Sequence, residues 1–375
     1  MMAFAGASVV FRVDASLQIG TGHVMRCLTL AAALKRQGAS CQFVCRAHEG
    51  HLLDHIARQG YDVSHLPLRQ GMAVSDGTAH GDWLGCAWAT DAAQTIAALG
   101  GRSVDWLIVD HYALDARWEE MIAPHAVHIL AIDDLADRLH ACELLLDQNL
   151  GRHEADYAGR VPSDCRVLAG PRFALLRPEF AELRQYSLRR RQVPALHRLL
   201  ITMGGIDAPN ATSTVLRALQ TMGKDELPSE CQISVVMGAA APWLGSVREE
   251  ANRMSWPTEV LVGIGDMAQC MADSDLAIGA AGSTAWERCC LGLPSLMVVL
   301  ADNQREAARH LRDRGAAKCL DLDDELENGL RSFLRSASKQ SAILSCMSEE
   351  AREITDGKGC NLVACEMRRL TVQSH

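Results

Sequence analysis

The residues best placed for chemistry lie in a short turn, Gly20-Thr21-Gly22-His23, between an apolar stretch and an amphipathic one. Glycines in a strand-to-helix turn let a ligand approach the backbone and the N–H groups of the first helical turn. His23 falls in that turn, where the helix dipole disfavours the imidazolium and keeps the ring neutral, as a general base requires. A histidine here can also cap or pack the helix, and spacing alone leaves both roles open.

This turn does not match two common nucleotide-binding motifs. In G-x-G-x-x-G the third glycine would stand where this chain has Met25, and the acidic ribose ligand expected about 20 residues onward is absent. The G-K-[ST] of a P-loop is also missing. Asp14 and His111, each near the end of a predicted strand, can orient a water molecule or His23. Each can equally be an ordinary turn residue, and we rank Asp14 ahead of His111 as a catalytic residue.

A second glycine-rich turn, residues 279–284, follows an apolar run in the second half of the chain. Ser283 and Thr284 open a predicted helix whose N-terminus can hold phosphate oxygens. Glu287, one turn further, can accept hydrogen bonds from two ribose hydroxyls. The same residues form a capping box in which Glu287 returns to its own helix N-terminus, so both interpretations stay open.

A third turn contains Gly204 and Gly205 and ends the first predicted strand of the second half. It is expected at the level of the turn at 279–284, and either turn alone can be an ordinary tight turn. Glycine-rich turns after strands occur in both halves of the chain, and this repetition favours ligand binding.

Short β-branched runs alternate with amphipathic stretches and predict the elements that position these turns. Alternation of this kind is typical of doubly wound parallel sheets. The strands of the first half are expected at 8–13, 41–45, 104–110, 127–133, 143–147 and 165–169, and those of the second at 197–202, 232–237, 259–262, 275–278 and 295–300. The sequence therefore predicts an α/β fold with two Rossmann-like doubly wound domains facing a cleft.

The domain boundary is expected in residues 178–194, whose charged stretch 184–191 suits a surface helix and linker. We place the first domain at 1–180 with the His23 turn, and the second at 195–340. Helices at 341–375 are expected to return to the first domain. Residues 69–85 are expected to form an irregular loop.

Composition excludes several classes of protein. The chain has 375 residues, 48% hydrophobic and 22% charged, which is ordinary for a globular protein. A net charge of −9 argues against a general nucleic-acid surface. Residues 1–11 are expected to form a strand rather than a signal peptide, and no apolar run reaches the roughly 20 residues of a membrane span. The fourteen cysteines are expected to be reduced, no metal motif is found, and we expect a cytoplasmic monomer without a cofactor.

Taken together, seven segments carry a resemblance that runs in order along nearly the whole chain. They resemble the UDP-2,4-diacetamido-2,4,6-trideoxy-β-L-altropyranose hydrolases of pseudaminic acid biosynthesis, and the Gly20–His23 turn in its context is the most specific part. The segments are 11–30, 108–112, 132–134, 146–149, 173–180, 203–207 and 301–304.

The resemblance implies a glycosyltransferase-B (GT-B) architecture and metal-independent cleavage of the glycosidic C–O bond, giving UDP and the free sugar with inversion at C1. It implies that His23 is the proton acceptor and that the second domain binds UDP. It places nucleotide-sugar contacts at Arg177, Glu287, Asn303 and Gln304, and uracil near the backbone of Ile264 and Gly265. A surface-polysaccharide or flagellin glycosylation pathway is the implied destination.

The chain departs from shorter members of this family at 69–101 and in its C-terminal extension, so the detail of the sugar stays open. Two other functions also remain: a GT-B glycosyltransferase that transfers the sugar to an acceptor hydroxyl, and a nucleotide-sugar binding protein without chemistry. Release of UDP without an acceptor separates the three.

Overall fold

The computed structural model describes residues 4–68, 80–239 and 241–373. The chain divides into two compact units, unit 1 with Met1–Leu175 and Gly359–His375, and unit 2 with Leu176–Lys358. Each unit contains one parallel sheet. The predicted α/β class with two doubly wound domains is therefore confirmed.

The sheet of unit 1 has seven strands in the order β3-β2-β1-β4-β5-β6-β7. The order in which the chain adds strands to this sheet reverses between β1 and β4, and ligands of open α/β sheets bind at the carboxyl ends of the strands at such a switch point. The strands are β1 (Ser8–Val13), β2 (Ser40–Arg46), β3 (Asp62–Leu66), β4 (Val104–Asp110), β5 (Ala126–Ile132), β6 (Leu144–Asp147) and β7 (Arg166–Ala169).

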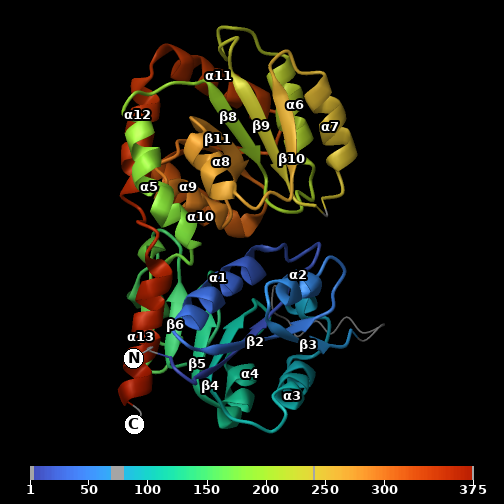
Figure 1. Cartoon of the computed structure of the whole chain (residues 1–375), viewed down its shortest axis with the longest axis vertical. Helices are drawn as coiled ribbons and strands as arrows, with labels where there is room; N and C mark the ends of the chain where they lie inside the picture. Colours follow the sequence, from blue (N-terminus) through green and yellow to red (C-terminus); the bar gives the residue numbers. More distant parts are fainter. Residues whose placement is uncertain (1–3, 69–79, 240, 374–375) are drawn as a thin grey trace. The chain divides into compact units, whose positions relative to one another are not determined.

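Helices cover both faces of this sheet (Figure 1). Alternate side chains of β1 pack on opposite sides: Phe11 lies in the core with α1 and α2, and Val10 in the core with α3 and α4. The helices are α1 (Gly22–Arg36), α2 (Leu53–Arg58), α3 (Trp88–Ala98) and α4 (Ala116–Ile122), with 3-10 helices η1 (Gly81–Leu84), η2 (Ala123–His125), η3 (Glu154–Tyr157) and η4 (Pro171–Phe173).

The last helix, α13 (Gly359–Gln373), also belongs to unit 1. Val363 and Met367 are fully buried in the core that contains α1, and Trp106 of β4 donates a hydrogen bond of 3.0 Å from Nε1 to Oγ1 of Thr371. Gly359 starts this helix against the backbone of Ala174, with no room for a Cβ.

Unit 2 repeats the same topology with six strands in the order β10-β9-β8-β11-β12-β13. The reversal lies between β8 and β11. The strands are β8 (Arg198–Thr202), β9 (Gln232–Met237), β10 (Thr258–Val262), β11 (Leu276–Ala280), β12 (Ser295–Val299) and β13 (Ala317–Asp321).

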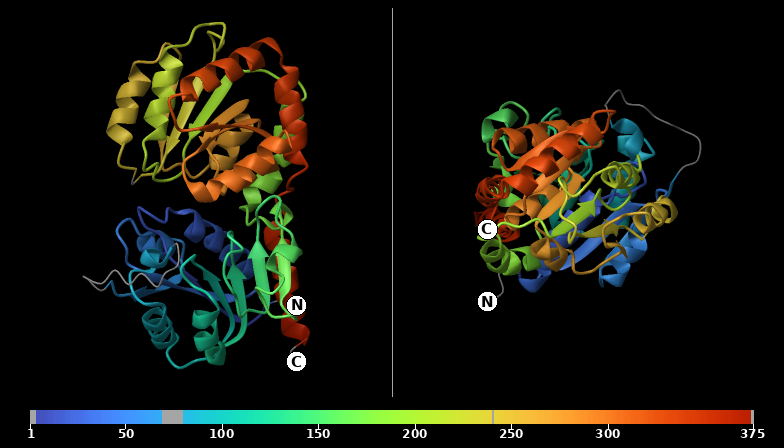
Figure 2. Two further views of the ribbon diagram at one scale, coloured as in Figure 1. Left: turned by 180° about the vertical axis from the view of Figure 1, so that it is seen from behind. Right: turned by 90° about the horizontal axis from the view of Figure 1, so that it is seen from above.

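The core of unit 2 joins one face of this sheet to α6, α7 and α11, while α8 and α9 contact β8 and β11 (Figures 1 and 2). The helices are α5 (Pro178–Arg190), α6 (Ala211–Gln220), α7 (Leu244–Asn252), α8 (Met267–Asp273), α9 (Thr284–Cys290), α10 (Arg305–Asp313), α11 (Leu326–Lys339) and α12 (Ala342–Arg352), with the 3-10 helix η5 (Asp302–Gln304).

The domain bounds differ from those expected at 180, 195 and 341. Helix α5 is not a linker, because Phe180 and Ser187 are buried where it packs on α8 and α9 of unit 2. Helix α12 packs on α9 and α11 and also belongs to unit 2, so only α13 of the C-terminal helices lies in unit 1. Of the loop expected at 69–85, residues 69–79 lie outside the described residues, and 81–84 form η1.

Candidate active site

The turn after β1 has the geometry that its glycines suggested. Gly20 has φ of +81°, a left-handed conformation that favours glycine, and its N–H donates to the carbonyl of Ser16. Helix α1 begins at Gly22, and Thr21 at its N-cap makes no side-chain capping bond. His23 therefore stands in the first turn of α1, at the carboxyl end of β1.

Asp110, the last residue of β4, holds the ring of His23. Its Oδ1 lies 2.6 Å from Nδ1 of His23, and the carboxylate is fully buried while the His23 side chain is 11% exposed. Burial alone would raise the pKa of Asp110, but Arg26 and His23 hold it well below its usual range. Because an ionised carboxylate only accepts, Nδ1 carries the proton and the lone pair of the neutral ring lies on Nε2.

Arg26, one turn after His23 on α1, fixes the dyad from the other side. Its Nε donates to Oδ2 of Asp110 at 2.7 Å, and its guanidinium forms an ion pair of 2.8 Å with Asp134. Asp134 also accepts a hydrogen bond of 2.7 Å from the hydroxyl of Tyr112, whose ring meets His23 edge-on at 4.7 Å between centroids. These contacts close a ring of five side chains that leaves His23 little freedom to rotate.

Asp14 lies elsewhere. Arg12 donates two hydrogen bonds to its carboxylate, of 2.7 and 2.9 Å, and the backbone N–H of Arg46 donates a third of 2.6 Å. Burial alone would raise the pKa of Asp14, but Arg12 and two histidine rings hold it well below its usual range. Asp110 and not Asp14 therefore orients His23 in this structure, while the other role considered for Asp14, orienting a water molecule, stays a prediction.

Strand parity is the physical reason for this correction. Val10 packs against α3 and α4, and Arg12, which points to the same face, pairs with Asp91 of α3 at 2.6 Å as well as with Asp14. In β4, Trp106 and Ile108 point to the face of α1, and Asp110 is in phase with them. Asp14 and Asp110 thus serve opposite faces of the sheet.

His111 joins the Asp14 cluster and not the His23 dyad. Its Nδ1 accepts a hydrogen bond of 3.1 Å from the backbone N–H of Ala113, and its Nε2 lies 3.5 Å from Oδ2 of Asp14. Burial is the main cause that lowers the pKa of His111 to about 3. The ring is therefore neutral, with its proton on Nε2 facing the carboxylate.

In unit 2 the predicted glycine turns flank the reversal between β8 and β11. Gly204 has φ of +90°, and the carbonyl of Gly205 lies only 2.1 Å from where a Cβ on Gly238 would stand. The turn after β8 thus packs on the turn after β9. Asp207 then caps α6, accepting from the backbone N–H groups of Ala211 and Thr212 at 2.8 and 2.9 Å.

Arg288 stabilises the turn after β11, and the sequence did not identify this residue as part of the site. Arg288 is fully buried and donates a hydrogen bond of 2.7 Å to the carbonyl of Ala280. Its guanidinium lies so close to Gly279 that a Cβ there would meet Nη1 at 2.5 Å. Burial lowers the pKa of Arg288 to about 10, still high enough for it to remain charged at neutral pH.

Glu287 does not form the capping box that its spacing allowed. Ser283 is the N-cap of α9 and makes no side-chain capping bond, whereas Glu287 lies 3.5 Å from Arg177. Burial raises the pKa of Glu287, and the charge of Arg177 opposes that rise. The structure therefore brings together these two predicted nucleotide-binding residues.

The remaining predicted residues lie in loops or at the start of helices at the carboxyl edge of the same sheet. Ser283 and Gly265 are exposed, and Thr284 and Ile264 are half-buried. Gln304 accepts a hydrogen bond of 3.1 Å from the backbone N–H of Leu300, and its Nε2 approaches Gly282. Asn303 lies in η5, and its side chain is outside the described part of the structure.

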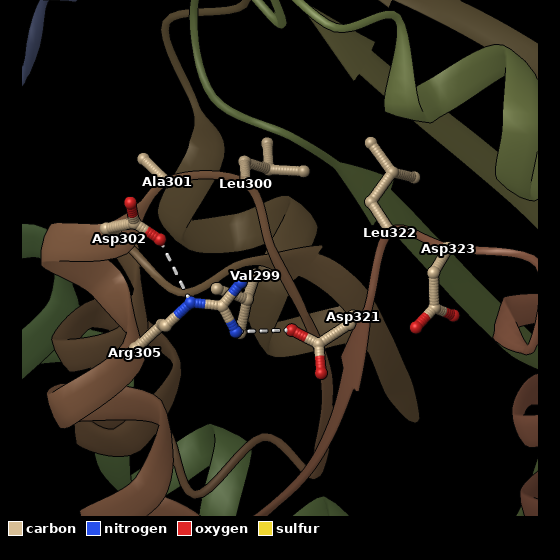
Figure 3. A pocket seen from close by; sticks show the side chains of 8 residues that line it. All are labelled: Val299, Leu300, Ala301, Asp302, Arg305, Asp321, Leu322 and Asp323. Carbon is tan, nitrogen blue, oxygen red and sulfur yellow. Dashed lines mark hydrogen bonds and ion pairs between the residues drawn. The ribbon is translucent and has the colours of Figure 1, made fainter.

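A cavity of about 510 Å³ lies beside these loops, at the carboxyl ends of β12 and β13. Figure 3 shows Arg305 between Asp302 and Asp321, to which it donates hydrogen bonds of 3.0 and 2.7 Å. The lining is completed by Val299, Leu300, Ala301, Leu322 and Asp323. Because the guanidinium of Arg305 already pairs with two carboxylates, this cavity is poorly suited to an anionic ligand.

Metal-ligating clusters and membrane-spanning helices are both missing from the described residues. Across 4–68, 80–239 and 241–373, no group of three or more His, Cys, Asp or Glu side chains is arranged to hold a metal ion. No helix in that part of the chain combines the length and apolar character needed to cross a membrane.

Comparisons with known proteins agree with this architecture. Residues 199–358 match the Glycosyltransferase family 28 C-terminal domain. The chain is 27% identical over 308 residues to the UDP-2,4-diacetamido-2,4,6-trideoxy-beta-L-altropyranose hydrolase of Campylobacter jejuni, an alignment that covers 82% of this chain and 97% of that protein. The resemblance inferred from the motifs is therefore confirmed.

A second relative is the spore coat polysaccharide biosynthesis protein SpsG of Bacillus subtilis, 28% identical over 218 residues, which are 57% of this chain and 61% of that protein. Among solved structures, MurG of Acinetobacter baumannii superposes with a TM-score of 0.66 at 16% identity, covering 97% of this chain and 99% of that one. The fold is GT-B-like, as expected from the sequence.

Proposed function

We propose that this chain hydrolyses the glycosidic C–O bond of UDP-2,4-diacetamido-2,4,6-trideoxy-β-L-altropyranose, giving UDP and the free sugar, as a step of pseudaminic acid biosynthesis. The observation that carries the proposal is the His23–Asp110 dyad at the switch point of unit 1. The similarity to the Campylobacter jejuni hydrolase, which extends over 97% of that protein, supports the choice of reaction.

The dyad supplies the base. With its proton on Nδ1 held by Asp110, His23 can take a proton on Nε2 from a water molecule as the water oxygen attacks C1. The imidazolium that forms is stabilised by the buried carboxylate, as in other carboxylate–histidine pairs. Attack on the face opposite to the leaving group inverts C1.

The leaving group explains why one base is enough. When the C1–O bond breaks, its electron pair goes to the β-phosphate of UDP, whose last pKa is about 6, like that of other phosphate monoesters. Ordinary glycosidases expel an alcohol and need a second carboxyl group as general acid. UDP leaves without that help, and the reaction as proposed requires no metal.

Nucleotide binding is assigned to unit 2. In this proposal Glu287 accepts hydrogen bonds from the ribose, and the turn at 279–284 donates backbone N–H groups to the diphosphate. The ion pair between Arg177 and Glu287 supports the first of these roles. Gly204 and Gly205, Ser283 and Thr284, and Asn303 and Gln304 complete the proposed contacts, with uracil at the backbone of Ile264 and Gly265.

A glycosyltransferase is the second candidate, because residues 199–358 match a glycosyltransferase domain. The test is release of UDP from the purified chain with chelator present and no acceptor. Stoichiometric UDP and free sugar support hydrolysis. UDP that appears only after an acceptor is added identifies a transferase, and binding of UDP-sugar without any UDP release identifies a non-catalytic binding protein.

A further inference from the structure

We propose that an aromatic pair, His80 and Trp83, lines the sugar side of the site at His23 and selects the sugar through contact with its apolar surface. The pair lies within residues 69–101, the stretch in which the sequence is expected to depart from shorter members of the family that it resembles. The inference rests on the proposed function and deepens it, because it names the side chains that recognise the sugar.

Ring contacts connect the pair to the dyad. The ring of Tyr112 lies 4.7 Å from that of His23, edge-on. The centroid of the Tyr112 ring also lies 5.3 Å from that of His80 and 5.7 Å from that of Trp83, and the Tyr112 and Trp83 rings are stacked. The centroids of the His80 and Trp83 rings are 4.5 Å apart. His23 is thus the polar end of a continuous aromatic cluster that continues outward through Tyr112.

The cluster is anchored at its base and open at its outer end. Tyr112 is buried, and its hydroxyl donates to Asp134. Leu84, next to Trp83 in η1, is 1% exposed and fixes that helix in the core under α3 and α4. His80 and Trp83 themselves are only half-buried, so part of each side chain remains accessible to a ligand.

Charge on the pair is also suited to an apolar contact. Burial is the main cause that lowers the pKa of His80, and the nearby charge of Arg138 acts in the same direction, against that of Asp137. At neutral pH the imidazole of His80 is therefore uncharged. Two neutral aromatic rings, 4.5 Å apart and inclined at 51° to each other, offer apolar surface for C–H groups and methyl groups.

The proposed sugar has such groups. A 6-deoxy sugar with two acetamido groups carries three methyl groups and lacks the hydroxyl of C6, so it presents more apolar surface than a common hexose. Since the water molecule that Nε2 of His23 deprotonates must reach C1 of this sugar, the sugar ring and its substituents must lie within reach of side chains one or two ring contacts away.

The test separates sugar recognition from turnover by using the His23→Ala background, in which bound substrate persists. Binding of UDP and of UDP-2,4-diacetamido-2,4,6-trideoxy-β-L-altropyranose is measured by calorimetry for His23→Ala, His23→Ala/Trp83→Ala and His23→Ala/Trp88→Ala. Trp88 opens α3 in the same segment but contacts Arg117 instead of Tyr112, which makes it the matched control.

We expect Trp83→Ala to weaken UDP-sugar binding by about tenfold or more while UDP binding is unchanged, and Trp88→Ala to change neither. Equal binding of the UDP-sugar with and without the Trp83 ring, or no preference for the UDP-sugar over UDP in the parent, overturns the inference. Turnover is measured separately on the wild type. A wild type that binds the UDP-sugar through Trp83 but releases no UDP refutes the proposed hydrolysis and leaves this inference standing.

Discussion

Nδ1 of His23 and Oδ1 of Asp110 lie 2.6 Å apart although 87 positions separate the two residues in the sequence. The parallel pairing of β1 with β4 brings them together. His23 lies in the turn of helix that follows β1, Asp110 is the last residue of β4, and the carboxyl ends of the two strands meet at the switch point. This contact fixes which ring nitrogen carries the proton, and it leads directly to the first prediction.

Replacing Asp110 with asparagine should lower the rate of UDP release by about 10²- to 10⁴-fold, because the amide can donate to Nδ1 and favour the tautomer with its proton on Nε2. The measurement is kcat by a coupled UDP assay, with UDP affinity as a check that unit 2 is intact. An Asp110→Asn variant with the wild-type kcat would show that the dyad has no part in the reaction.

Asp147→Asn is the matched control, since Asp147 is another buried carboxylate at the end of a strand in the same sheet. Burial, with a contribution from Asp134, raises its pKa to about 7, so an uncharged amide resembles a form that it already adopts at neutral pH. Its carboxylate accepts hydrogen bonds from the hydroxyl of Tyr157 at 2.8 Å and from the backbone N–H of Asn149 at 2.9 Å, and it lies 3.3 Å from Nε of Arg152. We expect this variant to keep both its fold and its rate.

His111 should make the protein less stable as pH falls below about 6.5. Its pKa is about 3 in the folded state against an ordinary 6.5, so between these values the unfolded chain binds one proton more. The contribution of the neutral His111 ring to the free energy of unfolding is fully present above about pH 6.5. It falls by up to about 1.4 kcal/mol for each pH unit below that value. Denaturant unfolding of wild type and His111→Asn between pH 8 and 4 measures the difference.

The asparagine keeps an acceptor for the N–H of Ala113 but does not titrate. We expect the free energy of unfolding to depend less on pH in the variant over this range. Asp14 and Asp110, whose pKa values are lowered, act in a different window: their contribution is present above about pH 4 and is lost in stronger acid. Parallel curves for wild type and variant between pH 6.5 and 4 would disprove the assignment to His111.

Gly279→Ala should destabilise unit 2 by about 2–3 kcal/mol, because the added Cβ would meet Nη1 of Arg288 at 2.5 Å and the carbonyl of Thr202 at 2.7 Å. Gly245→Ala is the control. Gly245 lies in α7, where an added Cβ would meet open space, so alanine there should be neutral or stabilising by up to about 1 kcal/mol. Similar unfolding free energies for the two variants would show that the backbone at Gly279 shifts to accommodate the added Cβ without loss of stability.

Much of the fold was predictable because buried parallel strands are nearly continuous apolar runs, and most predicted strands agree with the observed ones within a residue or two. The exceptions β3 (Asp62–Leu66) and β13 (Ala317–Asp321) are edge strands, and their polar, partly exposed residues hide them from a hydrophobicity pattern. The 3-10 helix η1 is too short to leave a periodic signal.

The candidate site was predictable only in part. The glycine turn pointed to His23, whereas Asp110 was passed over in favour of Asp14. Alternation along β4 carried the missing signal: Asp110 is in phase with Trp106 and Ile108, which face α1, while Asp14 is in phase with Val10, which faces α3. The second partner of Arg12 could not be predicted, since Asp91 of α3 accepts its hydrogen bond across 79 positions of the sequence.

The measurement that tests the central claim most directly is turnover of UDP-2,4-diacetamido-2,4,6-trideoxy-β-L-altropyranose in ¹⁸O water with chelator present. Wild type, His23→Ala and the control His51→Ala, which alters an exposed histidine, are compared by mass spectrometry. The account predicts label on the sugar and none on UDP, with a loss of at least about 10²-fold in rate for His23→Ala alone. Label on UDP, or an undiminished rate in His23→Ala, would contradict it.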